Sequence, residues 1–165
     1  MDLPHVDPLR PHSPLDRALF AFGRSRAGRW YGIHVASPVD AFVLKRTGGK
    51  LRLTGPLPTA VLTTTGARSG AKRENPVVYF HDADDVILIA SSFGREKHPA
   101  WYHNLRAHHD VLLNGHSFRA TDVTDDGEYE RLYGLAEQLY PGYSDYRARA
   151  TASGRRIPVL RLTPA

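Results

Sequence analysis

An Asn114-Gly115 pair between two short runs of strand-forming residues is the feature that most constrains how this chain can fold. Asn-Gly is the strongest short hairpin signal, because both residues tolerate the left-handed backbone that a tight two-residue turn requires. The flanking runs, Val111–Leu113 and Phe118–Val123, have the length of strands. The sequence therefore predicts an antiparallel hairpin at this point.

Further short strands are predicted on both sides of this hairpin. A polar turn, His81 to Asp85, separates Asn75–Phe80 from Val86–Ala90 and predicts a second hairpin with a turn of three to five residues. The β-branched run Ala60–Thr65 and the alternating residues Val159–Thr163 predict a first and a last strand. Many short antiparallel strands in one chain favour a barrel.

Helices are predicted ahead of these strands. Ser13-Pro14-Leu15-Asp16 places Ser at an N-cap and Pro at the first helical position, and apolar residues follow at helical spacing (Leu15, Ala18, Leu19 and Phe22). Ser37-Pro38-Val39-Asp40 repeats the start signal, and Gly48-Gly49 supplies a stop. Residues 1–13 are expected to form a flexible tail.

Further helices are predicted inside and after the run of strands. Asp125 and Glu128 form a capping box before apolar residues at helical spacing, which predicts a helix over 127–139. Shorter helices are expected over 99–107 and 143–152. At 165 residues the chain has the length of one domain, expected to cover 14–165.

Composition excludes several classes of chemistry. The chain has no Cys, so it has no disulfide, thiolate metal site or cysteine nucleophile. Its nine His residues include no His-Glu-x-x-His motif and are poorly spaced for one helical face, so no metal site is expected. No apolar run approaches the 18 residues or so that a membrane span needs, and the segment 1–14 does not resemble a signal peptide. A cytoplasmic protein is expected.

The charge distribution points to an anionic partner. The net charge is +5, and the segment from Ala41 to Arg73 holds seven basic residues and no acidic one. Nucleic acid, acidic lipid and phosphorylated small molecules all fit such a field. Nucleic acid is set aside, because Phe42 is the only aromatic residue of that stretch. The basic and aromatic segment Gly23 to Gly32 is either a solvated loop with two anchoring aromatics or a contact with an anionic membrane surface.

A glycine-rich turn carries much of this basic charge. After Thr63-Thr64-Thr65, the residues Gly66 to Arg73 (GARSGAKR) contain two glycines, one serine and three basic residues. Glycines leave backbone N–H groups open to an anion, and Arg and Ser add donors. The pattern lacks the ending of a P-loop and the spacing of a nucleophile elbow. A cradle for phosphate or carboxylate and a solvated basic hairpin remain equal alternatives.

Two later stretches place polar and aromatic residues at helix starts. Ser91 to Leu105 leads from a strand end into a helix N-terminus, where free N–H groups can hold an anion. The alternative is that its apolar residues pack in the core (Trp101, Tyr102, Leu105). Three tyrosines recur at three-residue spacing, where they would line a planar ligand or simply pack (Tyr140, Tyr143, Tyr146).

Four spaced motifs cover roughly residue 38 to the end of the chain. They are LTTTGARSGAKRENPVVYF, SSFGREKHPAWYHNLRAHHDV, YPGYSDYRARA and RRIPVLRLTP, and SPVDAFVLKRTGG fits ahead of them. Together they resemble the deazaflavin-dependent nitroreductase family of actinobacteria. The resemblance implies an α+β fold, a split antiparallel β-barrel with flanking helices that binds coenzyme F420. It also implies hydride transfer from reduced F420 to a nitroaromatic, a quinone or another conjugated acceptor.

The resemblance further implies which residues bind F420. Its phosphodiester and polyglutamate tail, a long polyanion, would lie on the basic turn (Ala67, Arg68, Ser69, Arg73). The ring would follow the backbone of the next strand (Glu74, Asn75, Pro76, Val77, Val78) and a strand end (Ala90, Ser91, Ser92). The family's helix pattern matches Trp101, Tyr102 and Asn104. Its ring-side tyrosine matches Tyr143, with Tyr140 and Tyr146 near the acceptor.

Hydroxyl groups are the candidates for chemistry on the acceptor. The cofactor carries the hydride, so the protein needs mainly to hold the reacting atoms about 3–3.5 Å apart and exclude water. A donor must then meet the anion that develops on the acceptor oxygen. The candidates for this role are Ser91, Tyr143, Tyr140 and Tyr146.

Three departures from the family pattern bear on the tail and the acceptor. Ala67 stands where the family often has a basic residue. Val78 stands where some members have an aromatic residue and would open the acceptor pocket, and Phe93 replaces a small residue and would narrow the tail entrance. An FMN-binding split-barrel reductase or oxidase and a non-catalytic F420-binding protein remain alternatives. The expected partners are F420 and a small hydrophobic acceptor, in a monomer or a homodimer.

Overall fold

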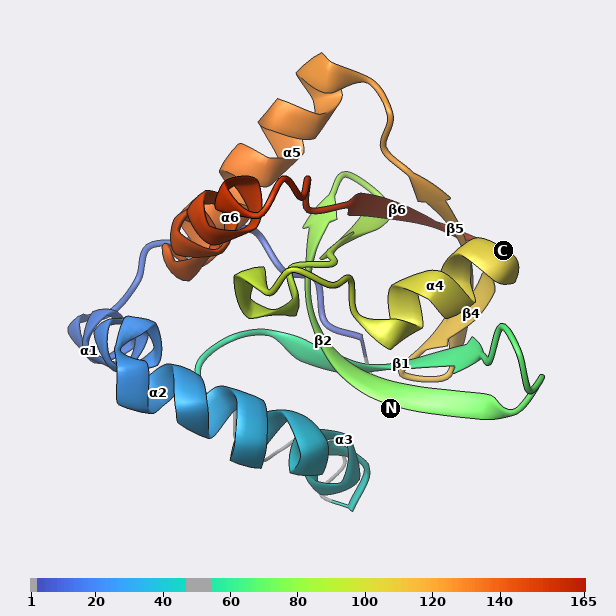
Figure 1. Cartoon of the computed structure of the whole chain (residues 1–165), viewed down its shortest axis with the longest axis horizontal. Helices are drawn as coiled ribbons and strands as arrows, with labels where there is room; N and C mark the ends of the chain where they lie inside the picture. The colour runs from blue at the N-terminus through green and yellow to red at the C-terminus, as the bar shows by residue number, and fades with distance from the viewer. Residues whose placement is uncertain (1–2, 47–54) are drawn as a thin grey trace.

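The computed structural model describes residues 3–46 and 55–165, without the side chains of residues 37, 38, 41, 44 and 45. A closed antiparallel barrel with the strand order β1-β2-β3-β6-β5-β4 forms its centre (Figure 1), as the predicted fold class requires. The strands are β1 (Thr59–Thr65), β2 (Lys72–Asp82), β3 (Asp85–Ile89), β4 (Asp110–Leu113), β5 (His116–Asp122) and β6 (Val159–Pro164).

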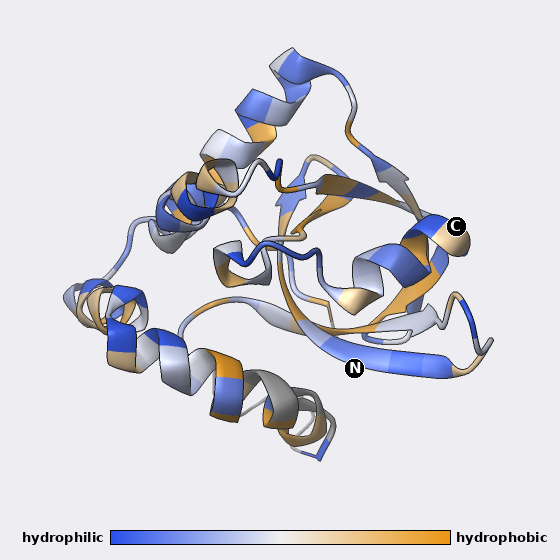
Figure 2. Ribbon diagram, viewed as in Figure 1, coloured by the Kyte–Doolittle hydropathy of each residue, from blue (hydrophilic) through white to orange (hydrophobic). Residues whose placement is uncertain are grey.

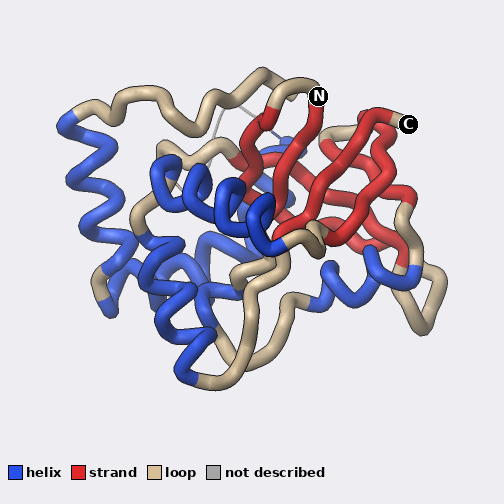
Figure 3. The backbone as a smooth tube through the Cα atoms, turned by 90° about the horizontal axis from the view of Figure 1, so that it is seen from above, coloured by secondary structure: helices blue, strands red, loops and turns tan. Residues whose placement is uncertain are grey.

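Helices flank this barrel, and most of them gather on one side of it, as Figure 3 shows. Their bounds are α1 (Pro14–Arg24), α2 (Arg26–Tyr31), the π-helical turn η1 (Gly32–Ala36), α3 (Ser37–Arg46), the 3-10 turn η2 (Ser92–Gly94), α4 (Ala100–Ala107), α5 (Asp126–Leu139) and α6 (Gly142–Ala152). The three helices predicted after residue 98 are confirmed to within a residue or two.

Both predicted hairpins are present, and one is tighter than expected. Leu113 pairs with His116 across the Asn114-Gly115 turn, in which both turn residues have positive φ. In the earlier hairpin Asp82 pairs with Asp85, so the turn has two residues rather than three to five. The strands continue into the predicted turn because Ala83 adopts a left-handed φ of 54° and closes it early.

Strand β3 is buried on both faces, which explains its continuous apolar run. Val86 and Leu88 belong to the cluster that fills the barrel interior. Ile87 and Ile89 belong to a second cluster, which packs the outside of the barrel against the helices and includes Tyr133 of α5. The barrel is therefore covered by helices where β3 runs, and Figure 2 shows apolar colouring along the strands.

Helix α1 begins as predicted, but its apolar stripe faces outward. The Ser13 hydroxyl accepts from the Asp16 N–H at 3.1 Å, and the Asp16 carboxylate accepts from the Ser13 N–H at 2.9 Å. Leu15 is 68% exposed and Phe22 is 53% exposed, while Phe20 is the buried residue of this helix. The spacing correctly indicated a helix, but the apolar face that it predicted is largely exposed.

The segment Gly23 to Gly32 is helical, so the expectation of a solvated loop is wrong. Ser25 ends α1 and caps α2, accepting from the Gly28 N–H at 3.0 Å. A side chain at Gly28 would lie 2.0 Å from the Phe22 carbonyl oxygen, so this glycine permits a close helix junction rather than a loop. Trp30 is 60% exposed and anchors nothing in the core.

The helix predicted from Ser37 is continuous with the one before it, because η1 leads directly into α3. The predicted Gly48-Gly49 stop lies outside the described residues. No helix within 3–46 or 55–165 combines the length and the apolar character that a membrane span requires.

Residues 3–6, expected to belong to a flexible tail, lie against strand β2. The Val6 N–H donates to Nδ1 of His81 at 3.0 Å, and the Val6 carbonyl oxygen accepts from the His81 N–H at 2.9 Å. The Tyr79 hydroxyl donates to the Pro4 carbonyl oxygen at 3.0 Å. One backbone bond and two side-chain bonds thus hold this short piece of the N-terminal segment against β2.

Candidate active site

A cavity of about 380 Å³ opens where the barrel meets the helices. Strand β2 provides one wall through Asn75 to Val78, and the loop after β3 provides another. Tyr140 and α6 close the cavity from the helix side, and the start of α4 contributes Trp101. This is the arrangement of a ligand site, apolar with a few convergent polar groups.

Strand β2 runs from a charged exterior into this cavity. Its first residues, Lys72 to Glu74, are exposed, and the next four line the cavity. Figure 2 shows the hydrophilic colouring of the start of the strand. A ligand lying along β2 would therefore pass from a basic exterior to an apolar interior within a few residues.

The loop after β3 holds an unusual backbone at the cavity wall. Ser92, Phe93 and Gly94 all have positive φ, at 50°, 57° and 73°. This region is strained for residues other than glycine and persists only where the surroundings hold it. A side chain at Gly94 would lie 2.8 Å from the Tyr146 carbonyl oxygen, so the loop lies directly against α6.

Arg155, which the sequence reasoning missed, holds this loop from behind. Arg155 is 7% exposed, and its guanidinium donates to the carbonyl oxygens of Ala90, Ser91 and Arg95 at 2.5, 3.0 and 2.6 Å. Its Nε–H donates to Nδ1 of His98 at 3.0 Å, so that nitrogen carries no proton. Burial lowers the pKa of Arg155 and that of His98. In the sequence Arg155 is only the first residue of an Arg155-Arg156 pair, and nothing in that pair indicates a buried role.

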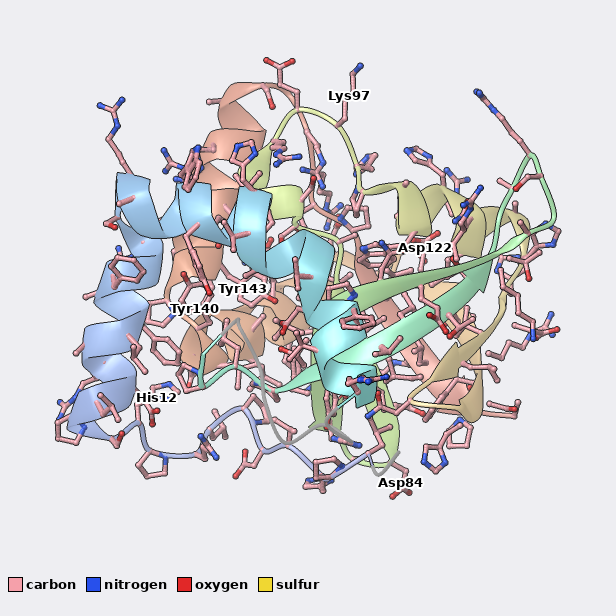
Figure 4. The ribbon with its side chains drawn as sticks, turned by 90° about the horizontal axis from the view of Figure 1, so that it is seen from below. His12, Asp84, Lys97, Asp122, Tyr140 and Tyr143 are labelled. Atoms are coloured by element: carbon pink, nitrogen blue, oxygen red, sulfur yellow. The ribbon has the colours of Figure 1, made fainter. Side chains whose placement is uncertain are left out.

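The three tyrosines predicted to line a ligand form one cluster at the cavity. Their ring centroids lie 5.8–6.1 Å apart with interplanar angles of 62–86°, the edge-to-face geometry that aromatic rings prefer (Tyr140, Tyr143, Tyr146). Figure 4 shows Tyr140 and Tyr143 where α1, α2 and α6 meet. Burial raises the pKa of all three phenols, so they remain neutral hydrogen-bond donors at physiological pH.

The glycine-rich turn lies outside the cavity and is less open than a cradle requires. The N–H groups of Gly66, Gly70 and Ala71 bond within the turn, and that of Ala67 donates to Oδ1 of Asn104 at 3.0 Å. Among the described residues this leaves the N–H groups of Arg68 and Ser69 without a partner. An anion here would be held by these two groups and by the exposed basic side chains.

The structure separates the predicted cofactor residues into two groups. Those that line the cavity are Asn75, Pro76, Val77, Val78, Ser91, Ser92, Trp101 and Tyr143. Those on or beside the turn are Ala67, Arg68, Ser69, Arg73 and Glu74. Asn104 belongs with the turn, because its Nδ2 donates to the Thr64 hydroxyl at 3.2 Å and its Oδ1 accepts from the Ala67 N–H at 3.0 Å.

Two predicted residues lie behind the cavity wall rather than in it. Ala90 is fully buried, and its carbonyl oxygen accepts from Arg155. Tyr102 packs in the barrel core beside Leu105, as the alternative of simple core packing predicted. The roles of Ala90 and Tyr102 in cofactor binding stay predictions. These two residues would act by positioning the residues that line the cavity, because they do not line it themselves.

These residues fit a long anionic cofactor with a flat ring. The cavity offers planar aromatic side chains and a strand edge for the ring, with the Ser91 hydroxyl nearby. The exposed residues of β2 and the turn before it offer positive charge for a phosphate and carboxylate chain. Strand β2 joins the two regions. A molecule with charge at one end and a ring at the other could therefore bind along it.

The chain matches known proteins along most of its length. The family model for F420H(2)-dependent quinone reductases matches residues 39–164. An F420H(2)-dependent quinone reductase of Mycobacterium tuberculosis (strain H37Rv) is 33% identical over 147 residues, covering 82% of this chain and 96% of that protein. A solved F420-H2 dependent reductase (FDR-A) is 32% identical with a TM-score of 0.54, over 64% of this chain and 93% of that one.

A second solved structure, described as a domain-swapped dimer, is 30% identical with a TM-score of 0.56, over 76% of this chain and 99% of that one. The fold and these relatives thus define a split-barrel oxidoreductase that uses a deazaflavin. The chain belongs to the F420H(2)-dependent quinone reductase family. The predicted enzyme class and the predicted donor, reduced coenzyme F420, are confirmed at the level of this family.

Proposed function

We propose that this protein reduces a quinone with reduced F420 bound along β2. The observation that carries the proposal is the course of β2, which joins exposed basic residues to the tyrosine-lined cavity. The charged chain of F420 would lie over Arg68, Lys72 and Arg73, and its ring over Asn75 to Val78. When bound, reduced F420 supplies a hydride, and the reduction of a quinone to its hydroquinone needs one further proton.

The chain's own residues would bind, orient and shield the reactants. The tyrosine cluster and Phe93 would exclude water from the ring, and the Ser91 hydroxyl lies on the same cavity wall. Tyr143 is the first candidate donor to the acceptor oxygen, because its phenol is buried at the cavity and stays protonated. The turnover proton would enter from solvent through such a hydroxyl.

A turnover assay tests this proposal. Purified protein is mixed with reduced F420 and a water-soluble quinone, and the return of F420 fluorescence is followed. We expect enzyme-dependent oxidation of F420 that saturates with quinone. Oxidation no faster than without protein, across several quinones and nitroaromatics, would contradict the proposal. It would leave the non-catalytic F420-binding protein as the better account.

The outward face of the N-terminal helices supports a contact with a membrane surface. We propose a cytoplasmic protein that touches an anionic bilayer through residues 23–32. Phe22 and Trp30 are exposed beside the basic residues Arg24, Arg26 and Arg29, the combination that draws a helix to an acidic interface. Co-sedimentation with anionic but not zwitterionic vesicles is expected, and it should weaken in Trp30→Ala. An equal amount of protein in the pellet with and without anionic vesicles would contradict this contact.

A homodimer is the oligomeric state that we propose. The support is the 30% identical relative described as a domain-swapped dimer. Light scattering on a sizing column would show twice the chain mass of 18.4 kDa. A single-chain mass over the working range of concentrations would contradict the dimer and leave the monomer.

A further inference from the structure

A second cavity adjoins the proposed F420 site. This α1–α2 chamber has a volume of about 220 Å³ and lies between α1, α2 and η1 on one side and Tyr140 and α6 on the other. Four residues line both cavities: Leu57, Phe93, Tyr140 and Tyr146. The chamber and the F420 cavity therefore share a wall, and that wall contains two of the three clustered tyrosines.

The lining of the chamber is apolar. Arg29 is the one charged residue among its described lining residues, and the others are aliphatic, aromatic, glycine or proline. Two glycines keep the space clear. A Cβ at Gly23 would lie 3.0 Å from the Tyr140 hydroxyl oxygen, and a Cβ at Gly32 would lie 3.3 Å from the Phe93 ring. With so few polar groups, the chamber suits hydrocarbon better than a polar head group.

The chamber also opens at the surface through apolar side chains. Leu19 and Phe22 line it and are 42% and 53% exposed. Helix α1 is held over this region by the ion pair between Arg24 Nε and Asp145 Oδ2 of α6, at 2.7 Å, and by the edge contact of Phe20 with Tyr140. The apolar opening is thus part of a supported arrangement of helices.

We infer that the α1–α2 chamber takes the hydrocarbon side chain of the quinone acceptor while the quinone ring lies in the F420 cavity. This inference rests on the proposed function. The occupant follows from adjacency, because the two cavities share four lining residues and a ring against this shared wall would have its substituent next to the chamber. Each methylene group that leaves water should tighten binding about fourfold. The structure thus assigns the selection between tailed and tail-free quinones to the α1–α2 chamber.

A pair of charge substitutions on α1 tests the inference. Leu19→Glu places a carboxylate in the chamber opening. Leu15→Glu makes the same change one turn earlier, at a residue that is 68% exposed and lines neither cavity. For each protein, kcat/KM is measured without vesicles for one quinone ring with a short isoprenoid side chain and for the same ring with none. The ratio of the two kcat/KM values reports the contribution of the tail, because the reacting ring is the same in both quinones.

We expect the wild-type ratio to exceed one, Leu19→Glu to lower it about tenfold, and Leu15→Glu to preserve it. An equal ratio in all three proteins would overturn the inference. An equal fall in both variants would overturn it too, because the outer face of α1, against a second copy or a bilayer, would then be responsible.

A cofactor-free measurement separates this inference from the proposed function. Quenching of tryptophan fluorescence by the oxidised, tailed quinone gives its Kd without F420. Weaker binding in Leu19→Glu than in Leu15→Glu supports the chamber even if reduced F420 proves not to be the donor. Identical Kd values in the two variants would overturn the chamber, whatever the turnover assay shows.

Discussion

At the scale of single residues, Tyr143 is buried, keeps a neutral phenol and lines the cavity. Replacing it with Phe removes one hydroxyl and little volume, so F420 affinity should change little. We expect kcat to fall about a hundredfold if this hydroxyl meets the developing charge on the acceptor. Since burial raises the pKa of Tyr143, its donor function should persist above about pH 10, where an ordinary tyrosine loses its proton. Tyr129→Phe, a buried tyrosine outside the cavity, is the control, and unchanged turnover in Tyr143→Phe would assign the role to Ser91 or another tyrosine.

Arg155 should matter both for stability and for catalysis. Arg155→Ala leaves buried carbonyl oxygens of the loop unpaired, which should cost about 3 kcal/mol in the free energy of unfolding. If the loop sets the cavity wall, kcat should also fall in the folded variant, and Arg155→Lys should restore stability better than turnover. Arg156→Ala is the matched control, because that neighbour pairs with Asp126 at the surface. Full turnover in folded Arg155→Ala would limit Arg155 to a structural role.

The residues that sequence reasoning found and missed differ in a physical way. The tyrosines were found because their spacing repeats along one element. Arg155 was missed because its partners, such as Ala90 and Arg95, lie more than fifty residues away and are backbone oxygens. No pattern in the sequence marks a backbone acceptor.

At the scale of the elements, the turn between β1 and β2 should recognise the charged end of F420. We expect Arg68→Glu to weaken F420 binding about tenfold and to make the remaining affinity less sensitive to salt. Arg26→Glu, the same change on exposed α2, should leave F420 binding unchanged. Fluorescence titrations at two salt concentrations give both quantities. Equal affinities in the two variants would move the charged chain away from this turn.

Elements that are determined by neighbouring residues were predicted better than elements that depend on contacts with distant residues. The Asn114-Gly115 hairpin and the capped start of α1 rest on neighbouring residues and were predicted correctly. Helix α2 was missed because Gly28 resembles a loop residue in sequence, whereas its function is a close approach to the Phe22 carbonyl. The outward apolar face of α1 could not be predicted either, since spacing gives a face but not its partner.

At the scale of the whole molecule, two half-buried histidines should make stability depend on pH. Burial lowers the pKa of His81 and of His98, and each offers Nδ1 as an acceptor only when neutral. The unfolded chain takes up these protons first, so stability should be constant above about pH 6.5 and fall as the pH drops below it. Urea unfolding from about pH 7.5 to about pH 5 measures the effect.

His81→Asn tests one of the two contributions separately. An Asn side chain can offer an acceptor to the Val6 N–H and does not titrate, so the loss of stability in acid should be smaller. His108→Asn changes an exposed histidine and serves as the control. If the free energy of unfolding of His81→Asn falls with pH as steeply as that of the wild type, the N-terminal contact with β2 does not depend on this ring.

The measurement that tests the central claim most directly is a fluorescence titration of the purified protein with F420, with FMN in parallel. The account predicts saturable binding of F420, weakened by Arg68→Glu, and no comparable binding of FMN. Binding of FMN in preference to F420, or of neither, would contradict the claim that β2 and its basic turn form a site for a deazaflavin with a polyanionic tail.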